Sequence, residues 1–198
     1  MGFTIAIDGP AAAGKGTLSK AIASHFDFAH LDTGLLYRAV GAKTLLGVEP
    51  LDAALKLVVA DMDDTDLRTP EVAQAASKVA IIPEVRAALV DFQRAFGARA
   101  GGAVLDGRDI GTVICPDADI KLFITASDEI RAERRSLELQ SRGINVTKPQ
   151  VLAEMQERDL RDSVRLDEHL KPGHDAHLID TSDMTPNQVM DAALDVIM

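Results

Sequence analysis

The sequence contains no apolar run long enough to cross a membrane, and it has a single cysteine. Its longest apolar stretches, such as residues 55–60 with Lys56 inside them, are far shorter than the roughly 18 to 20 residues that a membrane span needs. Cys115 has no partner within the chain, which excludes an intrachain disulfide and is typical of a reducing compartment. The apolar N-terminal run ends at Asp8 and has no basic flank, so we expect a cytoplasmic protein without a secretory signal.

Basic residues are in deficit as well. The 21 Lys and Arg residues face 31 Asp and Glu residues, which gives a net charge of −10. Binding to nucleic acid or to an anionic membrane requires a basic face, so we expect neither as a partner. An anionic ligand must therefore be held locally. Arginines gather at residues 131–135 and 158–165, which permits local binding, although such clusters also occur on solvated helix faces.

No internal repeat, low-complexity tract or linker rich in Pro, Gly or Ser divides the chain. Its 198 residues suit one domain, and 46% hydrophobic with 26% charged residues are typical of a globular protein with a real core. We therefore expect residues 1–198 to form a single domain that is a monomer.

Short apolar runs alternate with segments of helical periodicity. We expect strands at residues 3–7, 28–31, 103–105, 120–124 and 177–179. We expect helices at residues 15–26, 33–46, 51–60, 70–79, 83–96, 128–140, 148–164 and 186–197. This alternation predicts an α/β fold with a parallel five-stranded sheet flanked by helices. Ligands bind beyond the carboxyl ends of such strands, where residues 8–9, 32–34 and 106–109 are expected.

The segment after the first strand has the spacing of a phosphate-binding loop: glycine, four residues, glycine and lysine. Its glycines let backbone N–H groups curl around phosphates, and the lysine reaches the β- and γ-phosphates. This motif predicts a P-loop NTPase fold with ATP bound by Gly9, Pro10, Ala11, Ala12, Ala13, Gly14, Lys15, Gly16 and Thr17. Gly16 occupies the usual hydroxyl position, so Thr17 is the candidate Mg²⁺ ligand. The alternative is an alanine-rich helix start with an incidental lysine.

The Gly-Lys-Gly-Thr variant resembles nucleoside monophosphate kinases, and further blocks resemble the bacterial cytidylate kinase family. These blocks are residues 31–40 (Leu-Asp-Thr-Gly-Leu-Leu-Tyr-Arg-Ala-Val), Ser77 with 83–86, 105–113, 131–135, 157–165 and 170–172. They occur in family order across nearly the whole chain. The resemblance implies ATP-dependent phosphorylation of CMP and dCMP to CDP and dCDP, with Mg²⁺ as the cofactor and small nucleotides as the partners.

The resemblance also implies roles for individual residues. The CMP phosphate is expected on Arg38, Arg108 and Arg165, the ribose on Arg158 and Asp162, and the cytosine on Ser77, Arg86 and Asp109. Thr33 and Tyr37 complete the CMP set, Arg134 faces ATP, and Asp106 orients a water on Mg²⁺ by looser similarity to adenylate kinases. Catalysis then falls to Lys15, Arg38, Arg108, Arg134 and Arg165. Guanidinium groups bind phosphate oxygens bidentately and stay charged, although each arginine alone could form a surface salt bridge.

By the same resemblance, the core comprises about residues 1–32, 98–127 and 170–198, with a monophosphate-binding region at 33–97 and a short lid at 141–166. The chain is short at residues 58–68, where longer family members insert a small antiparallel sheet, so we expect a reduced region of helices and a loop. Val164 stands where the family often has asparagine, and residues 167–169 are unusually polar, so this corner of the lid departs from the family pattern.

Two other functions remain as alternatives at this stage. A P-loop kinase of a metabolite such as shikimate would leave Ser77, Arg86 and Asp109 without a reason. A GTP-dependent switch needs the guanine-binding motif Asn-Lys-x-Asp, but neither Asn145 nor Asn187, the only asparagines, precedes a lysine. The favoured mechanism is direct in-line transfer of the γ-phosphoryl group, which relies on positioning and charge stabilisation.

Overall fold

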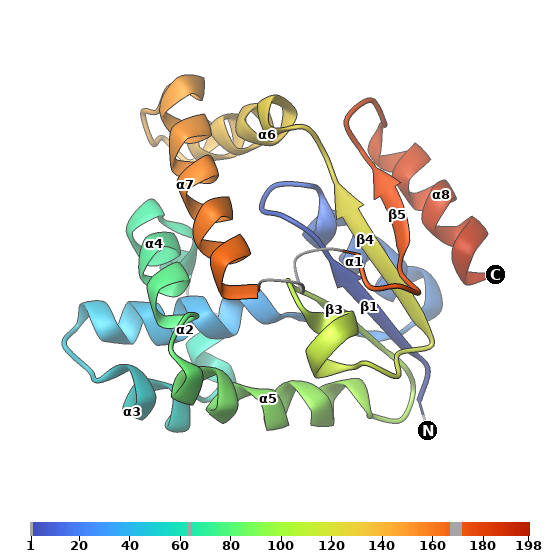
Figure 1. Ribbon diagram of the computed structural model, residues 1–198, viewed down its shortest axis with the longest axis horizontal. Helices are drawn as coiled ribbons and strands as arrows, with labels where there is room; N and C mark the ends of the chain where they lie inside the picture. Colours follow the sequence, from blue (N-terminus) through green and yellow to red (C-terminus); the bar gives the residue numbers. More distant parts are fainter. Residues whose placement is uncertain (1, 63–64, 167–171) are drawn as a thin grey trace.

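The computed structural model describes residues 2–62, 65–166 and 172–198, except for the side chains of residues 59, 65–66 and 163–166. Its centre is one parallel sheet with the strand order β2-β3-β1-β4-β5 (Figure 1). The strands are β1 (Thr4–Asp8), β2 (Ala29–Asp32), β3 (Ala103–Asp106), β4 (Ile120–Thr125) and β5 (His177–Asp180). The predicted α/β fold with five parallel strands is confirmed.

Helices cover both faces of this sheet. They are α1 (Lys15–Phe26), α2 (Thr33–Leu45), α3 (Pro50–Leu55), α4 (Pro70–Val79), α5 (Pro83–Gly97), α6 (Asp128–Ser141), α7 (Lys148–Leu166) and α8 (Pro186–Ile197). Figure 1 shows α2 to α5 grouped together, with α6 and α7 on the opposite side of the strands' carboxyl ends. No helix within the described ranges combines the length and apolar character that a membrane span requires.

The core has two halves because successive residues of a strand face opposite sides of the sheet. Ile5 and Ile7 of β1 pack with residues of α1 and α8. Ala6, between them, packs toward the other face with Leu105 and Ile114. All five residues of β1 are buried, as expected for the central strand of a parallel sheet. The sheet thereby holds the loops at its carboxyl end on a rigid base.

One predicted element was wrong, and one element was not predicted. The helix expected at residues 51–60 ends at Leu55, and a separate 3₁₀ turn, η1, covers Val59–Met62. The carboxylate of Asp61 accepts a hydrogen bond from the N–H of Val58 at 2.9 Å, which competes with helix continuation. Residues 110–114, where the sequence analysis assigned no element, form a single π-helical turn, η3. The described part of residues 33–97 holds helices and 3₁₀ turns and no strand, as expected for a shortened region.

Candidate active site

The phosphate-binding loop lies between the carboxyl end of β1 and the first turn of α1. Gly9 has φ +139°, and a Cβ there would lie 1.9 Å from the carbonyl oxygen of Ile124, so a side chain is excluded at this position. Gly14, at φ +98°, precedes the first helical residue, and no atom lies within 4 Å of a Cβ placed at Gly16. The loop therefore leaves open space at the helix N-terminus, where anions bind.

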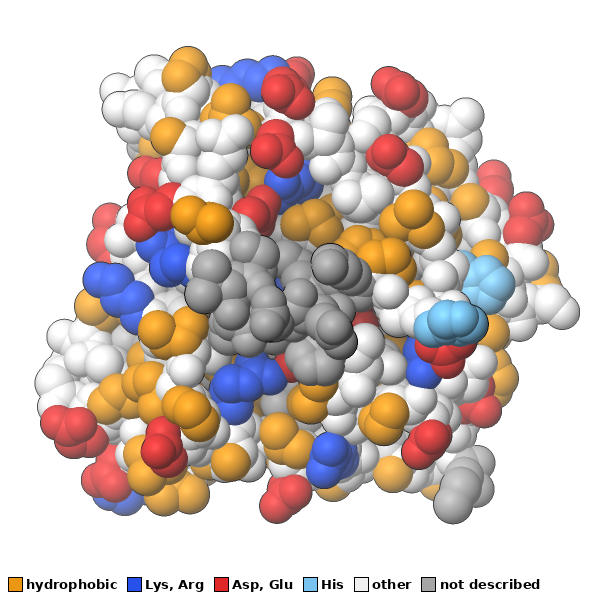
Figure 2. All heavy atoms as spheres, viewed as in Figure 1, with side chains coloured by type: hydrophobic (Ala, Val, Ile, Leu, Met, Phe, Trp, Pro, Cys, Tyr) orange, Lys and Arg blue, Asp and Glu red, His pale blue; other side chains and the backbone are white. Residues whose placement is uncertain are grey.

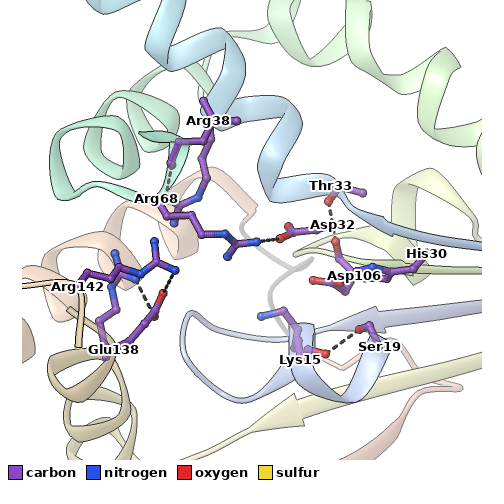
Figure 3. Close-up of polar contacts among 12 residues, drawn as sticks. Lys15, Ser19, His30, Asp32, Thr33, Arg38, Arg68, Asp106, Glu138 and Arg142 are labelled. Carbon is purple, nitrogen blue, oxygen red and sulfur yellow. Dashed lines mark hydrogen bonds and ion pairs between the residues drawn. The ribbon is translucent and has the colours of Figure 1, made fainter. Parts of the chain in front are cut away.

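Lys15 is the first residue of α1, and its ammonium group lies over the loop. Its Nζ donates a hydrogen bond to the carbonyl oxygen of Pro10 at 2.7 Å, and the residue is buried. Burial, reinforced by the positive charge of Arg108, lowers the pKa of Lys15 to about 7. Figure 3 shows the amine directed into the gap that Asp32 and Asp106 border. A phosphate bound there would supply the negative charge that the buried ammonium lacks.

This low pKa predicts proton uptake when ATP binds. The free amine is mostly neutral at pH 8, whereas the phosphates favour the ammonium form, so binding should take up close to one proton at pH 8 and about a tenth of one at pH 6. Affinity should accordingly fall as pH rises through 7. Calorimetry in buffers of different ionisation enthalpy measures the uptake, with Lys15→Met as the control. Equal uptake by this variant and the wild type would contradict the assignment.

Two arginines expected at the CMP phosphate lie at the same cavity from different elements. Arg38 of α2 donates from Nη1 to the carbonyl oxygen of Leu67 at 2.8 Å. Burial and the nearby cation Arg135 lower the pKa of Arg38 to about 10. Arg108 donates from Nη1 to the carbonyl oxygen of Gly9 at 2.8 Å and from Nε to Asp162 at 3.0 Å. Arg108 thus connects the phosphate-binding loop to α7.

The third predicted phosphate ligand, Arg165, lies in α7. The structure describes its backbone but not its side chain. The side chain of Val164 and residues 167–169, which depart from the family pattern, also lie outside the described part of the chain. Thr33 and Tyr37, at the start of α2, line the cavity. The hydroxyl of Thr33 donates to the carbonyl oxygen of Asp106 at 2.8 Å, which joins α2 to the end of β3.

The predicted cytosine-binding residues come together from three elements. Arg86 of α5 forms an ion pair with Asp109, which follows β3 and is 6% exposed. Ser77 of α4 is 4% exposed, and its hydroxyl has no hydrogen-bond partner among the described residues. A buried hydroxyl without a partner is costly, so a ligand that supplies one is favoured.

The predicted ribose-binding residues lie on α7. The carboxylate of Asp162 accepts from Arg108 and is 5% exposed. Within the described chain, Nε of Arg158 is buried without a hydrogen-bond partner. Burial and the adjacent cation Arg108 lower the pKa of Arg158 to about 9. Both residues border the cavity.

Arg134 of α6 fastens the phosphate-binding loop to the end of β5. It donates to the carbonyl oxygen of Thr181 at 2.7 Å and to its hydroxyl at 2.9 Å, and that hydroxyl lies 3.0 Å from the carbonyl oxygen of Ala13. Its guanidinium lines the cavity, on the side where ATP was expected. These contacts give Arg134 a positioning part in addition to the predicted contact with ATP.

The residues expected to hold Mg²⁺ offer oxygen atoms beside the loop. Thr17 contributes an accessible hydroxyl, and Asp106 contributes a carboxylate that is 5% exposed. Oδ2 of Asp106 lies 2.7 Å from Nε2 of His30, which fixes the orientation of the carboxylate. Hydroxyl and carboxylate oxygens suit Mg²⁺, and the open space over Gly16 leaves room for its waters. The residues present therefore fit this metal.

Sequence reasoning missed several residues that organise the site. The carboxylate of Asp8 accepts from the backbone N–H groups of Ile110 and Gly111 at 2.7 and 2.8 Å, which holds the turn that follows Asp109. Burial raises the pKa of Asp8 to about 6. Arg131 donates to the carbonyl oxygen of Ala11 and pairs with Asp159 at 2.7 Å. Asp8 is the last residue of β1, and the sequence placed it at the ligand-binding edge of the sheet without assigning it a role.

The loop and the CMP-side residues line one continuous cavity of about 1060 Å³. It reaches from Gly14 and Lys15 past Arg108 to Ser77, Arg86 and Asp109. On the face shown in Figure 2, basic side chains form separate small groups among acidic ones. Pockets that bind one drug-sized ligand measure roughly 300 to 1,000 Å³, so the volume of this cavity lies at the upper end of that range.

Comparisons with known proteins identify a family that matches nearly the whole chain. The sequence profile of a family described as Cytidylate kinase matches residues 5–198. A cytidylate kinase of Cereibacter sphaeroides is 59% identical over 197 residues, which cover 100% of this chain and 96% of that protein. One from Paramagnetospirillum magneticum is 56% identical, with 100% and 98% of the two chains covered.

Comparison with solved structures shows similarity in the fold only. An uncharacterized protein from Eubacterium ventriosum has a TM-score of 0.58 and 17% identity, with 100% of this chain and 98% of that chain covered. TT1252 from Thermus thermophilus has a TM-score of 0.51 with the same identity and coverage.

Proposed function

The chain belongs to the cytidylate kinase family, and we propose that it phosphorylates CMP and dCMP by in-line transfer of the γ-phosphoryl group of ATP, without a covalent enzyme intermediate. Membership of the family makes the chain a nucleoside monophosphate kinase, a transferase of pyrimidine nucleotide metabolism. We further propose roles for individual residues of the site.

One observation carries the proposal: the phosphate-binding loop and the cytosine-side residues border the same cavity. Lys15, Arg108 and Asp109 all line this cavity, and Arg108 contacts both the phosphate-binding loop and α7. A donor phosphate on Lys15 and an acceptor phosphate on Arg108 would therefore meet directly. A metabolite kinase would not need the orphaned hydroxyl of Ser77 beside the Arg86–Asp109 pair.

Phosphoryl transfer requires the protein to position the two nucleotides and to supply positive charge. Lys15 would hold the transferred group, while Arg38, Arg108, Arg134 and Arg165 would offset the charge that spreads over its oxygens. Bound Mg²⁺, on Thr17 directly and Asp106 through water, would neutralise charge on the donor phosphates. No activated serine or cysteine is required, because the acceptor oxygen belongs to CMP itself.

We also propose that the chain is divided into regions that together bind the two nucleotides. We propose that about residues 141–166 act as a lid, about residues 33–97 hold the monophosphate, and about residues 1–32, 98–127 and 170–198 form the core. Helices α6 and α7 pack through Leu139, Val151 and Met155, and the Arg131–Asp159 ion pair also joins α7 to α6. Closure over two nucleotides would exclude water and limit wasteful ATP hydrolysis. We further propose a cytoplasmic monomer that binds small nucleotides.

Stereochemistry tests the in-line step. ATP that carries an isotopically chiral γ-thiophosphate should yield a CDP analogue with inverted configuration at the transferred phosphorus, because a single displacement inverts it once. Retention would mean two displacements, and the direct mechanism would be abandoned. The product also identifies the acceptor, so a failure of CMP to react would be seen separately.

A further inference from the structure

Arg68 is a cation at the cavity that has no part in the site described above. It ends the 3₁₀ turn η2 (Thr65–Arg68) in the shortened part of the monophosphate-binding region. Its guanidinium lines the cavity, and Nη2 donates to Oδ2 of Asp32 at 3.3 Å. Figure 3 shows this side chain extending across the gap toward Asp32, on the side opposite Lys15.

The backbone beside Arg68 is fixed, and it also holds Arg38. Leu67 is 2% exposed and packs with Ala39 and Val72. Its carbonyl oxygen accepts the hydrogen bond from Arg38. Arg68 contributes to the lowered pKa of Arg38, as Arg135 does, because like charges are held close together. Two guanidinium groups therefore approach each other, and the carboxylates that act on Arg38 are those of Asp32 and Glu138.

Positive charge exceeds negative charge around these residues. Glu138 pairs with Arg135 at 2.7 Å and with Arg142 at 3.3 Å, while Asp32 faces Arg68. Arg38 donates only to the neutral carbonyl in the hydrogen bonds described. The end of the cavity beside Arg38 is thus suited to a compact dianion such as a phosphomonoester.

Asp32 has an alternative partner if it releases Arg68. It is the N-cap residue of α2, yet its side chain makes no capping hydrogen bond. Its Oδ1 already lies beside Gly34, only 3.0 Å from where a Cβ on that glycine would be. An N-cap carboxylate accepts from the N–H groups of the second or third helical residue, here Gly34 or Leu35. A small rotation would therefore exchange one partner for another.

We propose that Arg68 is a fourth phosphate-binding arginine of the acceptor site, and that Asp32 holds it extended toward the cavity until the monophosphate replaces this carboxylate. The inference rests on the proposed function, since the phosphate is that of CMP. The Asp32–Arg68 pair is partly exposed, at 22% and 34%, and its 3.3 Å distance is long for a charged pair, so a dianion can displace it.

Four variants test this exchange by steady-state kinetics and CMP-binding calorimetry. Arg68→Gln should raise the KM and Kd for CMP about tenfold, with the KM for ATP changed less than twofold. Asp32→Asn keeps a cap for α2 but frees Arg68 of its competitor, so CMP binding should be unchanged or tighter. The double variant should resemble Arg68→Gln. Arg99→Gln, at an exposed arginine outside the cavity lining, is the matched control and should change neither constant.

The direction in which Asp32→Asn changes the Kd for CMP distinguishes the exchange from a purely structural ion pair. If Asp32→Asn weakens CMP binding as much as Arg68→Gln does, the ion pair only braces the turn and the exchange is overturned. An unchanged Kd in Arg68→Gln would overturn the phosphate contact as well. The ratio of kcat/KM for CMP to kcat/KM for UMP should be the same in Arg68→Gln and wild type, because CMP and UMP carry the same phosphate group. Wild type that fails to phosphorylate CMP would refute the proposed function instead.

Discussion

Lys15→Ala is expected to lower kcat by about 10² to 10³-fold, the loss of roughly 2.7 to 4 kcal/mol that follows removal of one preorganised charge-stabilising donor. The ammonium lies over the loop, where it would follow the γ-phosphoryl group during transfer. Its burial lowers its pKa to about 7, so the charge is held there at a cost to folding. The variant should therefore stay folded.

Turnover of CMP and circular dichroism together test this expectation. Lys78→Ala, on the exposed side of α4, is the matched control and should keep wild-type turnover. A folded Lys15→Ala protein with more than about a tenth of wild-type kcat would show that the lysine does not serve the transferred phosphate.

Asp109→Ala is expected to reduce the preference for CMP over UMP by at least about tenfold, or about 1.4 kcal/mol. Cytosine offers an amino donor at position 4, and uracil has an oxygen there instead. Arg86 occupies one carboxylate oxygen of Asp109, which leaves the other able to accept from the amino group. A site built on such hydrogen bonds can reject the wrong analogue by up to about 10⁴ to 10⁵-fold.

The measured quantity is kcat/KM for each monophosphate at saturating MgATP. Asp109→Asn adds a sharper arm, because its amide can donate to the uracil oxygen and should favour UMP further. An unchanged ratio in both variants would mean that Asp109 serves only to hold Arg86, and base selection would then lie elsewhere.

Local sequence signals predicted the strands and the phosphate-binding loop. Ile5 and Ile7 lie in a uniformly apolar run because a central parallel strand is buried on both faces. Gly9 and Gly14 have positive φ values, so the loop's conformation is encoded by residue type at fixed spacing. The strand and the loop are both determined by residues close together in the sequence, so they can be predicted from one sequence.

Features set by distant residues could not be predicted in the same way. The π turn at residues 110–114 depends on the carboxylate of Asp8, about a hundred positions earlier. The Asp32–Arg68 and Arg131–Asp159 pairs likewise join separate elements. The roles of Arg38, Arg108 and Asp109 came from resemblance, and they stay predictions that kinetics must test.

The central claim is that one cavity brings the phosphate of ATP to the phosphate of a cytosine nucleotide. ADP release from MgATP, measured with CMP, dCMP, UMP, AMP, GMP and shikimate in parallel, tests it most directly. We predict rapid release with CMP and dCMP, and kcat/KM for the other four at least about a hundredfold lower. Comparable release with AMP, GMP or shikimate would contradict the account.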